Sequence, residues 1–351
     1  MTSKEHILHI LEINKGNTIS GEDLASHLKI SRAAVWKAIN ELRKDGHSIL
    51  AVTNKGYCLS PESDVISLQG IQPYLDAKSI SHDIHVYKTL DSTNQMLKQM
   101  ALGGALPGTV VIADEQLKGK GRMGRSFFSP ADTGIYMSLL LKPTFDVSKA
   151  VLITTAAAVA VCFAIEKVTG IQCGIKWVND IYVGDKKICG ILTEAVTDFE
   201  SGHIESIVLG IGINVTTSQE NFPKELEGVA GSLFDHENWK GKNSEPLDVP
   251  AENINKIFSR NKLIAEIINQ LTKINHNLES REFIKEYKAR SIVLGKEINV
   301  LKGGALDPHS GDDTPPIATA VDIDDDGGLV VQYKNGSTET LNSGEISIRL
   351  K

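Results

Sequence analysis

The stretch TVVIADEQLKGKGRMGRSFFSPADTGIYMSLLL, residues 109–141, decides between fold classes. Its middle part, Lys118–Arg125, fits the dinucleotide pattern G-x-G-x-x-G and misses the P-loop pattern only by an Arg in place of Lys. Both patterns need a strand before the glycines and a helix that opens on them. Residues 109–116 predict the strand, but the breaker Ser129-Pro130 and a second strand over 135–141 follow. We therefore expect a strand–loop–strand unit and neither phosphate-binding fold.

The loop itself holds three glycines and four cations in eight residues. One interpretation is a solvated hairpin tip. The other is an anion-binding flap, because glycines let the backbone close over a ligand while Arg and Lys supply positive charge. The density of Gly and Arg favours the flap.

The first 60 residues predict three helices followed by a hairpin. Apolar periodicity marks helices over 4–14, 22–28 and 32–46, and the segment 48–60 alternates around the turn Asn54-Lys55-Gly56. This order is typical of a winged helix-turn-helix domain. A three-helix module that binds protein has the same outline. DNA is favoured by cations on the third helix and at the wing tip, namely Arg32, Lys37, Arg43, Lys44 and Lys55.

The charge is unevenly distributed along the chain. Its 351 residues allow two or three domains, and the net charge of -7 argues against a protein that binds nucleic acid over its whole surface. Residues 1–62 carry eight Lys/Arg against seven Asp/Glu, a balance of +1 that leaves -8 for the remainder. The first segment therefore differs electrostatically from the rest.

The cysteines and the apolar segments indicate a reduced, soluble environment. Four cysteines form no C-x-x-C pair, which argues against a structural zinc site and for free cytosolic thiols. The N-terminus lacks a signal-type apolar region, and the longest apolar segment, residues 150–168, is rich in Ala and Thr. We interpret it as a core helix and expect a cytoplasmic protein that does not interact with membranes.

Beyond a linker at 61–64, strands and helices mix. Residues 66–289 predict a central α+β domain in which 206–215, with two glycines in an apolar run, form a buried strand. Residues 290–351 predict a small β-barrel of short strands, with a mobile loop over 303–316. The segment 322–328 imitates an EF-hand start, but the flanking strands predict a hairpin turn without calcium. The predicted domains are thus 1–62, 66–289 and 290–351.

Four short motifs stand in order along the central domain: DSTN (91–94), the flap with Gln116, KWVNDIYVGDKKICGIL (176–192) and GIGIN (210–214). With the winged helix before them and the barrel after them, the chain resembles the bacterial bifunctional biotin protein ligase/biotin operon repressor family over essentially its full length. The resemblance implies a class II synthetase-like central domain and an SH3-like C-terminal barrel. It also implies that the flap closes over an adenylate phosphate.

The activity implied by this resemblance has two steps. Biotin and ATP, with Mg²⁺, form biotinyl-5′-AMP and release pyrophosphate, and the biotin then passes to a lysine of a biotin carboxyl carrier protein. The resemblance further implies a homodimer in the biotinyl-AMP-bound state that binds operator DNA of biotin synthesis genes. Two alternatives remain, a lipoate-type ligase and a biotin sensor without catalytic activity.

The resemblance assigns roles to individual residues. Lys187 and Arg122 are the expected catalytic residues. The expected biotin contacts are Ser92, Thr93, Asn94, Gln116, Lys120, Gly121, Arg122 and Lys187. The expected ATP or adenylate contacts are Gly119, Arg122, Arg125, Lys176, Asn179, Asp180 and Asn214. Asp180 is also the one candidate ligand for magnesium.

Two positions depart from the family pattern, and two motifs have simpler explanations. Lys120 replaces an Arg, which keeps the charge but loses the bidentate fork, and Val178 replaces a Pro. The DSTN motif could supply the N-cap of the helix NQMLKQMA that follows, alone or together with a role in binding. Lys187, beside Lys186, could be a solvated turn lysine.

Overall fold

The computed structural model describes residues 1–142, 150–197, 204–234, 258–301, 315–342 and 345–348. The chain divides into two compact units, Met1–Ser81 with Glu245–Asn269, and His82–Ser244 with Gln270–Lys351. The loop expected over 303–316 lies outside the described residues except for its last two. The domain boundaries at residues 62 and 289 stay predictions.

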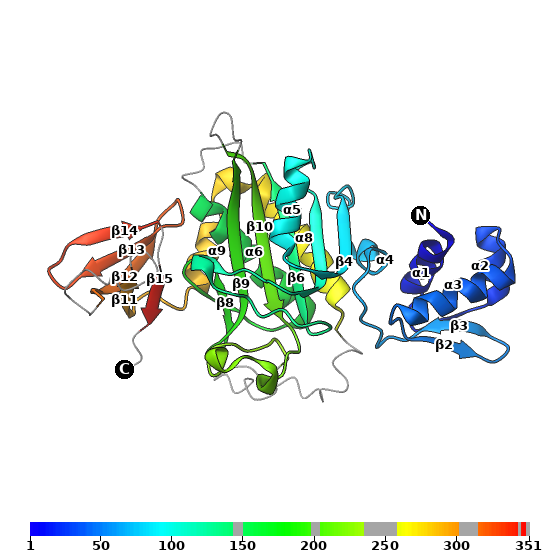
Figure 1. Cartoon of the computed structure of the whole chain (residues 1–351). Coiled ribbons are helices and arrows are strands. Elements are labelled where there is room, and N and C mark those ends of the chain that lie inside the picture. Colours follow the sequence, from blue (N-terminus) through cyan, green and yellow to red (C-terminus); the bar gives the residue numbers. More distant parts are fainter. Residues whose placement is uncertain (143–149, 198–203, 235–257, 302–314, 343–344, 349–351) are drawn as a thin grey trace. The chain divides into compact units, whose positions relative to one another are not determined.

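The first unit contains the predicted winged helix. Its helices are α1 (Ser3–Ile13), α2 (Gly21–Leu28) and α3 (Arg32–Lys44), and its strands are β1 (Thr18–Ile19), β2 (Ile49–Val52) and β3 (Gly56–Leu59), in the order β1-β3-β2 (Figure 1). The side chains of Thr2, Ser20 and Ser31 each cap a helix by accepting a backbone N–H three residues on. Apolar residues of all three helices and of the wing form one core. The predicted helices and hairpin are therefore confirmed.

The wing turns where the sequence predicts it. Asn54 and Gly56 have φ of 57° and 121°, values that Asn and Gly tolerate best. A Cβ on Gly56 would lie 2.0 Å from the carbonyl oxygen of Ile19. Residue 56 must therefore be glycine for β1 to pair with β3.

A buried guanidinium holds the segment that follows the wing. Arg260 is the first residue of α8 (Arg260–His276), and its side chain is 3% exposed. Its Nε donates to Asp64 Oδ2 and its Nη2 to the Asp64 carbonyl oxygen, both at 2.8 Å. The next residue, Asn261, bonds the backbone on both sides of Ile66, accepting from Ser67 N and donating to Val65 O. The segment therefore has a fixed path before α4 (Leu68–Ile71).

The second unit is built on a mixed seven-stranded sheet, ordered β4-β5-β6-β10-β9-β8-β7. Only β4 and β5 run parallel; the other neighbours are antiparallel. The strands are β4 (Ile84–Leu90), β5 (Val110–Gln116), β6 (Gly134–Leu141), β7 (Gly174–Lys176), β8 (Asp180–Val183), β9 (Lys186–Thr197) and β10 (Ile204–Asn214). The strands predicted at 109–116, 135–141 and 206–215 are confirmed.

Helices cover both faces of this sheet (Figure 1). Leu97 of α5 (Thr93–Leu102) packs with Leu140 and Val208. The adjacent strand residue Leu209 faces the other way, toward Ala156 of α6 (Ala150–Thr169). Because side chains alternate along a strand, even-numbered residues of β10 lie on the α5 face. This parity decides which residues can form a site beside α5.

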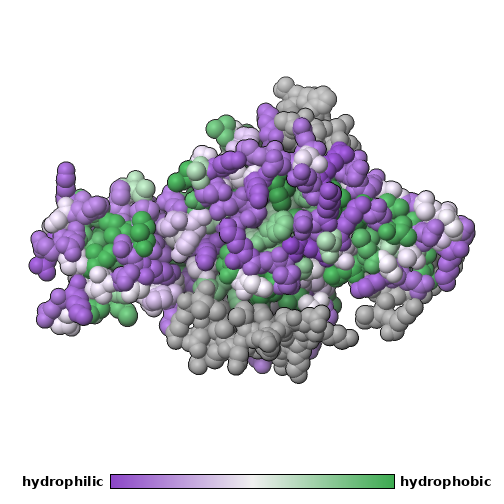
Figure 2. Space-filling model, turned by 180° about the vertical axis from the view of Figure 1, so that it is seen from behind, coloured by the Kyte–Doolittle hydropathy of each residue, from purple (hydrophilic) through white to green (hydrophobic). Residues whose placement is uncertain are grey.

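Helix α6 is the core helix that its composition predicts. By length and composition Val151–Thr169 could cross a membrane, but 72% of its most apolar window is buried. Arg290 of α9 (Phe283–Arg290) bonds Glu166 with two nitrogens and lies over the Phe163 ring, which joins α9 to α6. Hydrophilic residues cover most of the described surface that Figure 2 shows.

The C-terminal strands form a five-stranded antiparallel sheet ordered β14-β13-β12-β11-β15. They are β11 (Glu297–Leu301), β12 (Ile317–Ile323), β13 (Leu329–Tyr333), β14 (Thr338–Leu341) and β15 (Glu345–Ile348). Asp324 Oδ1 accepts the N–H groups of Asp326 and Gly328, which closes the turn between β12 and β13. The predicted hairpin turn is confirmed.

Candidate active site

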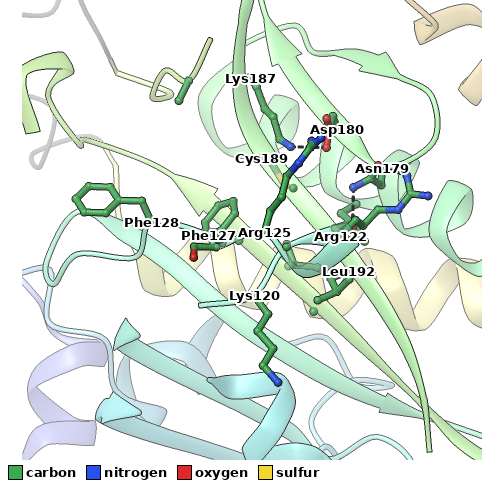
Figure 3. A pocket seen from close by; sticks show the side chains of 18 of the residues that line it. Lys120, Arg122, Arg125, Phe127, Phe128, Asn179, Asp180, Lys187, Cys189 and Leu192 are labelled. Carbon is green, nitrogen blue, oxygen red and sulfur yellow. Dashed lines mark hydrogen bonds and ion pairs between the residues drawn. The ribbon is translucent and has the colours of Figure 1, made fainter. Parts of the chain in front are cut away.

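A cavity of about 440 Å³ opens on the α5 face of the sheet (Figure 3). It brings together all but one of the residues expected to bind biotin or ATP: Ser92, Thr93, Asn94, Gln116, Lys120, Gly121, Arg122, Arg125, Lys176, Asn179, Asp180, Lys187 and Asn214. The exception is Gly119, which is buried at the start of the flap and does not line the cavity. Four distant motifs thus converge on one place.

Strand β10 forms the floor of the cavity through Gly210, Gly212 and Asn214. A Cβ on Gly210 would lie 2.2 Å from Asn94 Oδ1, and a Cβ on Gly212 would lie 2.5 Å from the Phe127 ring. The two glycines therefore create the space that Asn94 and Phe127 occupy. Three alternate residues span about 13 Å of strand, so the floor suits an elongated ligand.

Neutral polar groups gather at one end of this floor. The backbone N–H and the hydroxyl of Thr93 donate to Gln116 Oε1 at 2.8 and 3.1 Å, and Gln116 Nε2 donates to Ser129 Oγ at 3.0 Å. Ser92 occupies the N-cap position of α5, but its side chain makes no capping hydrogen bond. The hydroxyl of Ser92 is therefore not needed to cap the helix.

A cation and a carboxylate lie at the other end. Lys187 Nζ is 2.6 Å from Asp180 Oδ1, with side chains 30% and 21% exposed. The backbone of Lys187 is also fixed, since its N–H donates to Val229 O and its carbonyl accepts from Gly231 N, both at 2.9 Å. Lys187 belongs to β9 and lines the cavity, so the interpretation as a solvated turn lysine is wrong.

The two residues of the ND pair, Asn179 and Asp180, hold different cations. Arg122 Nη1 donates to Asn179 Oδ1 at 3.1 Å, while Asn179 Nδ2 donates to Ile191 O at 3.0 Å. The ND pair thus positions one cation of the flap and one of the sheet (Figure 3). Two positive groups line the same partly buried cavity, an arrangement that stabilises an anionic ligand.

Nearby nucleophilic side chains stay protonated. Burial, and then the charge of Asp180, raises the pKa of Tyr182 to about 12. Burial also raises the pKa of the Cys189 thiol well above its usual value. Both groups line the cavity and are neutral at pH 7, which disfavours covalent catalysis by either one.

The flap is the predicted strand–loop–strand connection between β5 and β6. It contains only a single helical turn, Arg122–Gly124, and closes on itself because Gly121 N donates to Arg125 O at 2.7 Å. Gly119 lies where a Cβ would meet Phe127 O at 2.3 Å, which explains why residue 119 is a glycine. Lys120 points away from the Lys187–Asp180 pair (Figure 3).

One amide oxygen on the floor is left for a ligand. Asn214 Nδ2 donates to Gly231 O at 3.1 Å, but its Oδ1 is buried and finds no donor among the described residues. A buried acceptor without a donor is costly unless a ligand supplies one.

Aromatic side chains in the cavity wall were not predicted. Phe127 lies edge-on to Tyr136 with ring centroids 6.4 Å apart, and Phe128 lies 6.0 Å from Phe222. The pair Phe127-Phe128 directly follows the flap, and this was the available signal. Among described residues no group of three His, Cys, Asp or Glu side chains could hold a metal, and Asp180 is the only acidic residue lining the cavity.

The expected DNA contacts lie on the winged helix. Arg32, Lys37, Arg43, Lys44 and Lys55 are all exposed. Arg43 Nε also donates to Ile49 O at 2.8 Å, so this residue ties α3 to the wing. On α3, Trp36 is 62% exposed between Arg32 and Lys37, and the sequence reasoning missed it.

Family models match three parts of the chain. The biotin/lipoate A/B protein ligase family matches residues 86–214, an HTH domain matches 3–58, and the biotin protein ligase C terminal domain matches 312–349. The described cavity residues come mostly from the first of these segments.

Relatives and solved structures agree with these matches. The chain is 38% identical over 232 residues to the bifunctional ligase/repressor BirA of Bacillus subtilis, covering 66% of this chain and 71% of the relative. It is 33% identical over 200 residues to BirA of Escherichia coli, covering 57% and 60%. The biotin protein ligase from Aquifex aeolicus in complex with biotin and ATP is similar with a TM-score of 0.58 and 25% identity, over 77% of this chain and 99% of that one.

Proposed function

This chain belongs to the bifunctional biotin protein ligase/repressor family, and we propose that it activates biotin with ATP and transfers it to a carrier protein. A carboxylate oxygen of biotin forms a bond to the α-phosphorus as the bond to pyrophosphate breaks, giving biotinyl-5′-AMP. The amine of a lysine on a biotin carboxyl carrier protein then attacks the acyl carbon, AMP leaves, and the nitrogen loses a proton.

The observation that carries this proposal is the polarity of the cavity along β10. Its neutral end at Gly210 offers amides and hydroxyls that suit a ureido ring, which has both donors and acceptors. Its other end offers Lys187, Arg122 and the acceptor of Asn214 to a nucleotide. The carboxylate and the α-phosphate would meet between these ends.

Charge stabilisation and positioning account for the chemistry. Two anions react, so Lys187 and Arg122 offset their repulsion and the negative charge that develops on the phosphoryl oxygens. Asp180 and Asn179 hold these two cations in place before the substrate arrives. The flap would also exclude water from the mixed anhydride, which hydrolyses readily.

The described lining residues offer few ligands for magnesium. Asp180 is the single carboxylate among the described lining residues, and it is already paired with Lys187. A Mg²⁺ ion is commonly held by one or two carboxylates together with substrate phosphates. We therefore assign Mg²⁺ to the ATP phosphates, with Asp180 as the one carboxylate ligand among the described lining residues. The bound ion would neutralise phosphate charge.

The helix-turn-helix supports a second role as a repressor of biotin synthesis genes. We infer that the biotinyl-AMP-bound chain forms a homodimer on a two-fold operator, since one module with a balance of +1 binds DNA weakly. We also infer a cytoplasmic location, a class II synthetase-like architecture for the central sheet and an SH3-like barrel for the C-terminal one.

Pyrophosphate release tests the ligase activity directly. Purified protein with biotin and ATP should release pyrophosphate and label a biotin carboxyl carrier domain, and lipoate should neither replace biotin nor compete with it. Release with lipoate alone would identify the lipoate-type ligase, and tight binding of biotin without release would identify the sensor.

A further inference from the structure

A second layer of polar side chains lies behind Asn94, which is 4% exposed. Asn94 Nδ2 donates to Glu194 Oε2 at 2.7 Å, and Asn94 Oδ1 accepts from Ser138 Oγ at 2.6 Å. Turning the amide by 180° would place its oxygen against the Glu194 carboxylate, where two acceptors repel. Glu194 therefore fixes which end of the amide is which.

The carboxylate of Glu194 is itself held from the same helix. Lys98 Nζ lies 2.6 Å from Glu194 Oε1, and Lys98 follows Asn94 by four residues, so both project from one face of α5. Burial raises the pKa of Glu194, but hydrogen bonds from Lys98 and Asn94 and the charges of Lys98 and Lys120 lower it overall. Glu194 is therefore ionised at neutral pH and can only accept hydrogen bonds.

The consequence appears on the ligand side of Asn94. Its Nδ2 is occupied by Glu194, with Leu192 O at 3.5 Å from the same nitrogen, whereas Oδ1 keeps a second lone pair and lies against Gly210 on the cavity floor. Asn94 can therefore offer an acceptor to a ligand but no donor.

We propose that Glu194 is a positioning residue that makes Asn94 an obligate acceptor, and that this selects ligands carrying a ureido N–H at the neutral end of the cavity. The inference rests on the proposed function and deepens it. A dithiolane ring has no N–H, so the same arrangement leaves Asn94 without a new partner when lipoate is offered. A site built to accept a specific N–H rejects analogues that lack it.

Glu194→Gln tests the arrangement, because its amide must turn its NH₂ toward either Asn94 or Lys98, and both are donors. The KM for biotin should rise roughly 10- to 100-fold, the loss expected for one charge-assisted hydrogen bond, while kcat and the KM for ATP change little. Discrimination between biotin and biotin methylated on either ureido nitrogen should fall by a similar factor.

The double variant Glu194→Gln/Lys98→Met supplies the rescue. Without the ammonium group, the new amide at position 194 can turn its oxygen to Asn94, so most of the biotin affinity and of the discrimination against the methylated analogues should return. Lys98→Met alone keeps the acceptor for Asn94 and should change the KM for biotin less than Glu194→Gln does.

Three results overturn the inference: an unchanged KM for biotin in Glu194→Gln, a double variant no better than the single one, or unchanged discrimination against both methylated analogues. A general loss of folding would raise the KM for ATP as well and would not be rescued by Lys98→Met. If the wild-type protein releases no pyrophosphate with biotin, the proposed function fails first and the inference falls with it.

Discussion

Gly212→Ala should separate nucleotide binding from biotin binding. The added methyl group would lie 2.5 Å from Cε1 and 2.7 Å from Cζ of Phe127, well inside contact distance, so the ring must leave the floor of β10. Overpacking of this kind costs about 1–3 kcal/mol. If ATP binds against the ring in its present position, binding must return the ring against the added methyl group and takes up this cost. The Kd for ATP should then rise roughly 5- to 150-fold, with biotin affinity little changed.

Gly190→Ala is the matched control. Gly190 pairs with Gly212 across the two strands and faces the same ring, but its added Cβ would lie 3.4 Å from Phe127 Cε2, an ordinary contact. The same chemical change against the same ring should therefore leave the Kd for ATP within about threefold. Gly210→Ala instead meets Asn94 Oδ1 at 2.2 Å and should weaken biotin rather than ATP.

Calorimetric titration of each variant with ATP and with biotin separately, beside urea unfolding, measures these effects. The reasoning is refuted if Gly190→Ala and Gly212→Ala weaken ATP equally, because contact distance would then not be the cause. It is also refuted if Gly212→Ala folds stably and binds ATP like the wild type.

Four further predictions follow from the site and from the winged helix. Lys187→Ala should lower the rate of pyrophosphate release roughly 10²–10³-fold, whereas Lys186→Ala, whose Nζ bonds Gly228 O, should not; near-normal release from Lys187→Ala removes its catalytic assignment. Arg122→Gly should release biotinyl-AMP about ten- to a hundredfold more readily, measured as biotin labelling of bystander proteins, and labelling at the wild-type level argues against retention by the flap. Biotin plus ATP should tighten operator binding in anisotropy titrations, and equal affinity with and without ligand contradicts the repressor proposal. Lys44→Ala should lower the salt dependence of DNA binding by about one unit of slope, and Arg32→Ala should relax the preference for the operator sequence. Burial lowers the pKa of His47 from 6.5 to about 4, so between these pH values the unfolded chain binds a proton that the folded chain does not. The free energy of unfolding should therefore fall by up to about 3 kcal/mol as the pH drops from 6.5 to 4. His47→Gln should flatten this pH dependence in urea unfolding, and an unchanged slope would show that another group causes it.

Much of the fold could be predicted because local signals are strong where they matter. Apolar periodicity located α1, α2 and α3, and the Asn54–Gly56 turn located the wing. The breaker after the flap excluded a helix at the glycines, and β6 follows as predicted. These features depend on residues within a few positions of one another.

Site residues could be predicted only where they belong to a recognisable motif. The structure brings four such residues to one cavity, namely Ser92, Gln116, Lys187 and Asn214. Glu194 carries no motif, although it falls at alternate positions from Gly190 and Leu192 on the α5 face of β9. Its importance depends on Asn94, a hundred residues away, and a sequence pattern does not show such a pairing.

The contacts in the structure also changed the interpretation of two residues. Lys187 resembles a surface lysine beside Lys186, and only the pairing of its backbone with residues 229–231 and of its Nζ with Asp180 places it inside. Gly119 looks like a ligand-binding glycine of the flap, yet its missing side chain is explained by the carbonyl oxygen of Phe127. Spacing along the chain does not distinguish a glycine needed for a ligand from one needed for packing.

The Arg260–Asp64 contact limits where the chain can be shortened. A fragment that begins at residue 63 loses the winged helix but keeps the Asp64 carboxylate beside a guanidinium that is 3% exposed. A fragment that begins at residue 66 loses Asp64 and with it a buried ion pair, and removing one member of such a pair typically costs about 3–5 kcal/mol. Two proteins that differ by three residues at their start should therefore behave differently, one a stable ligase without DNA binding and the other prone to aggregate. The minimal catalytic fragment is thus defined by an ion pair and not by the end of the wing.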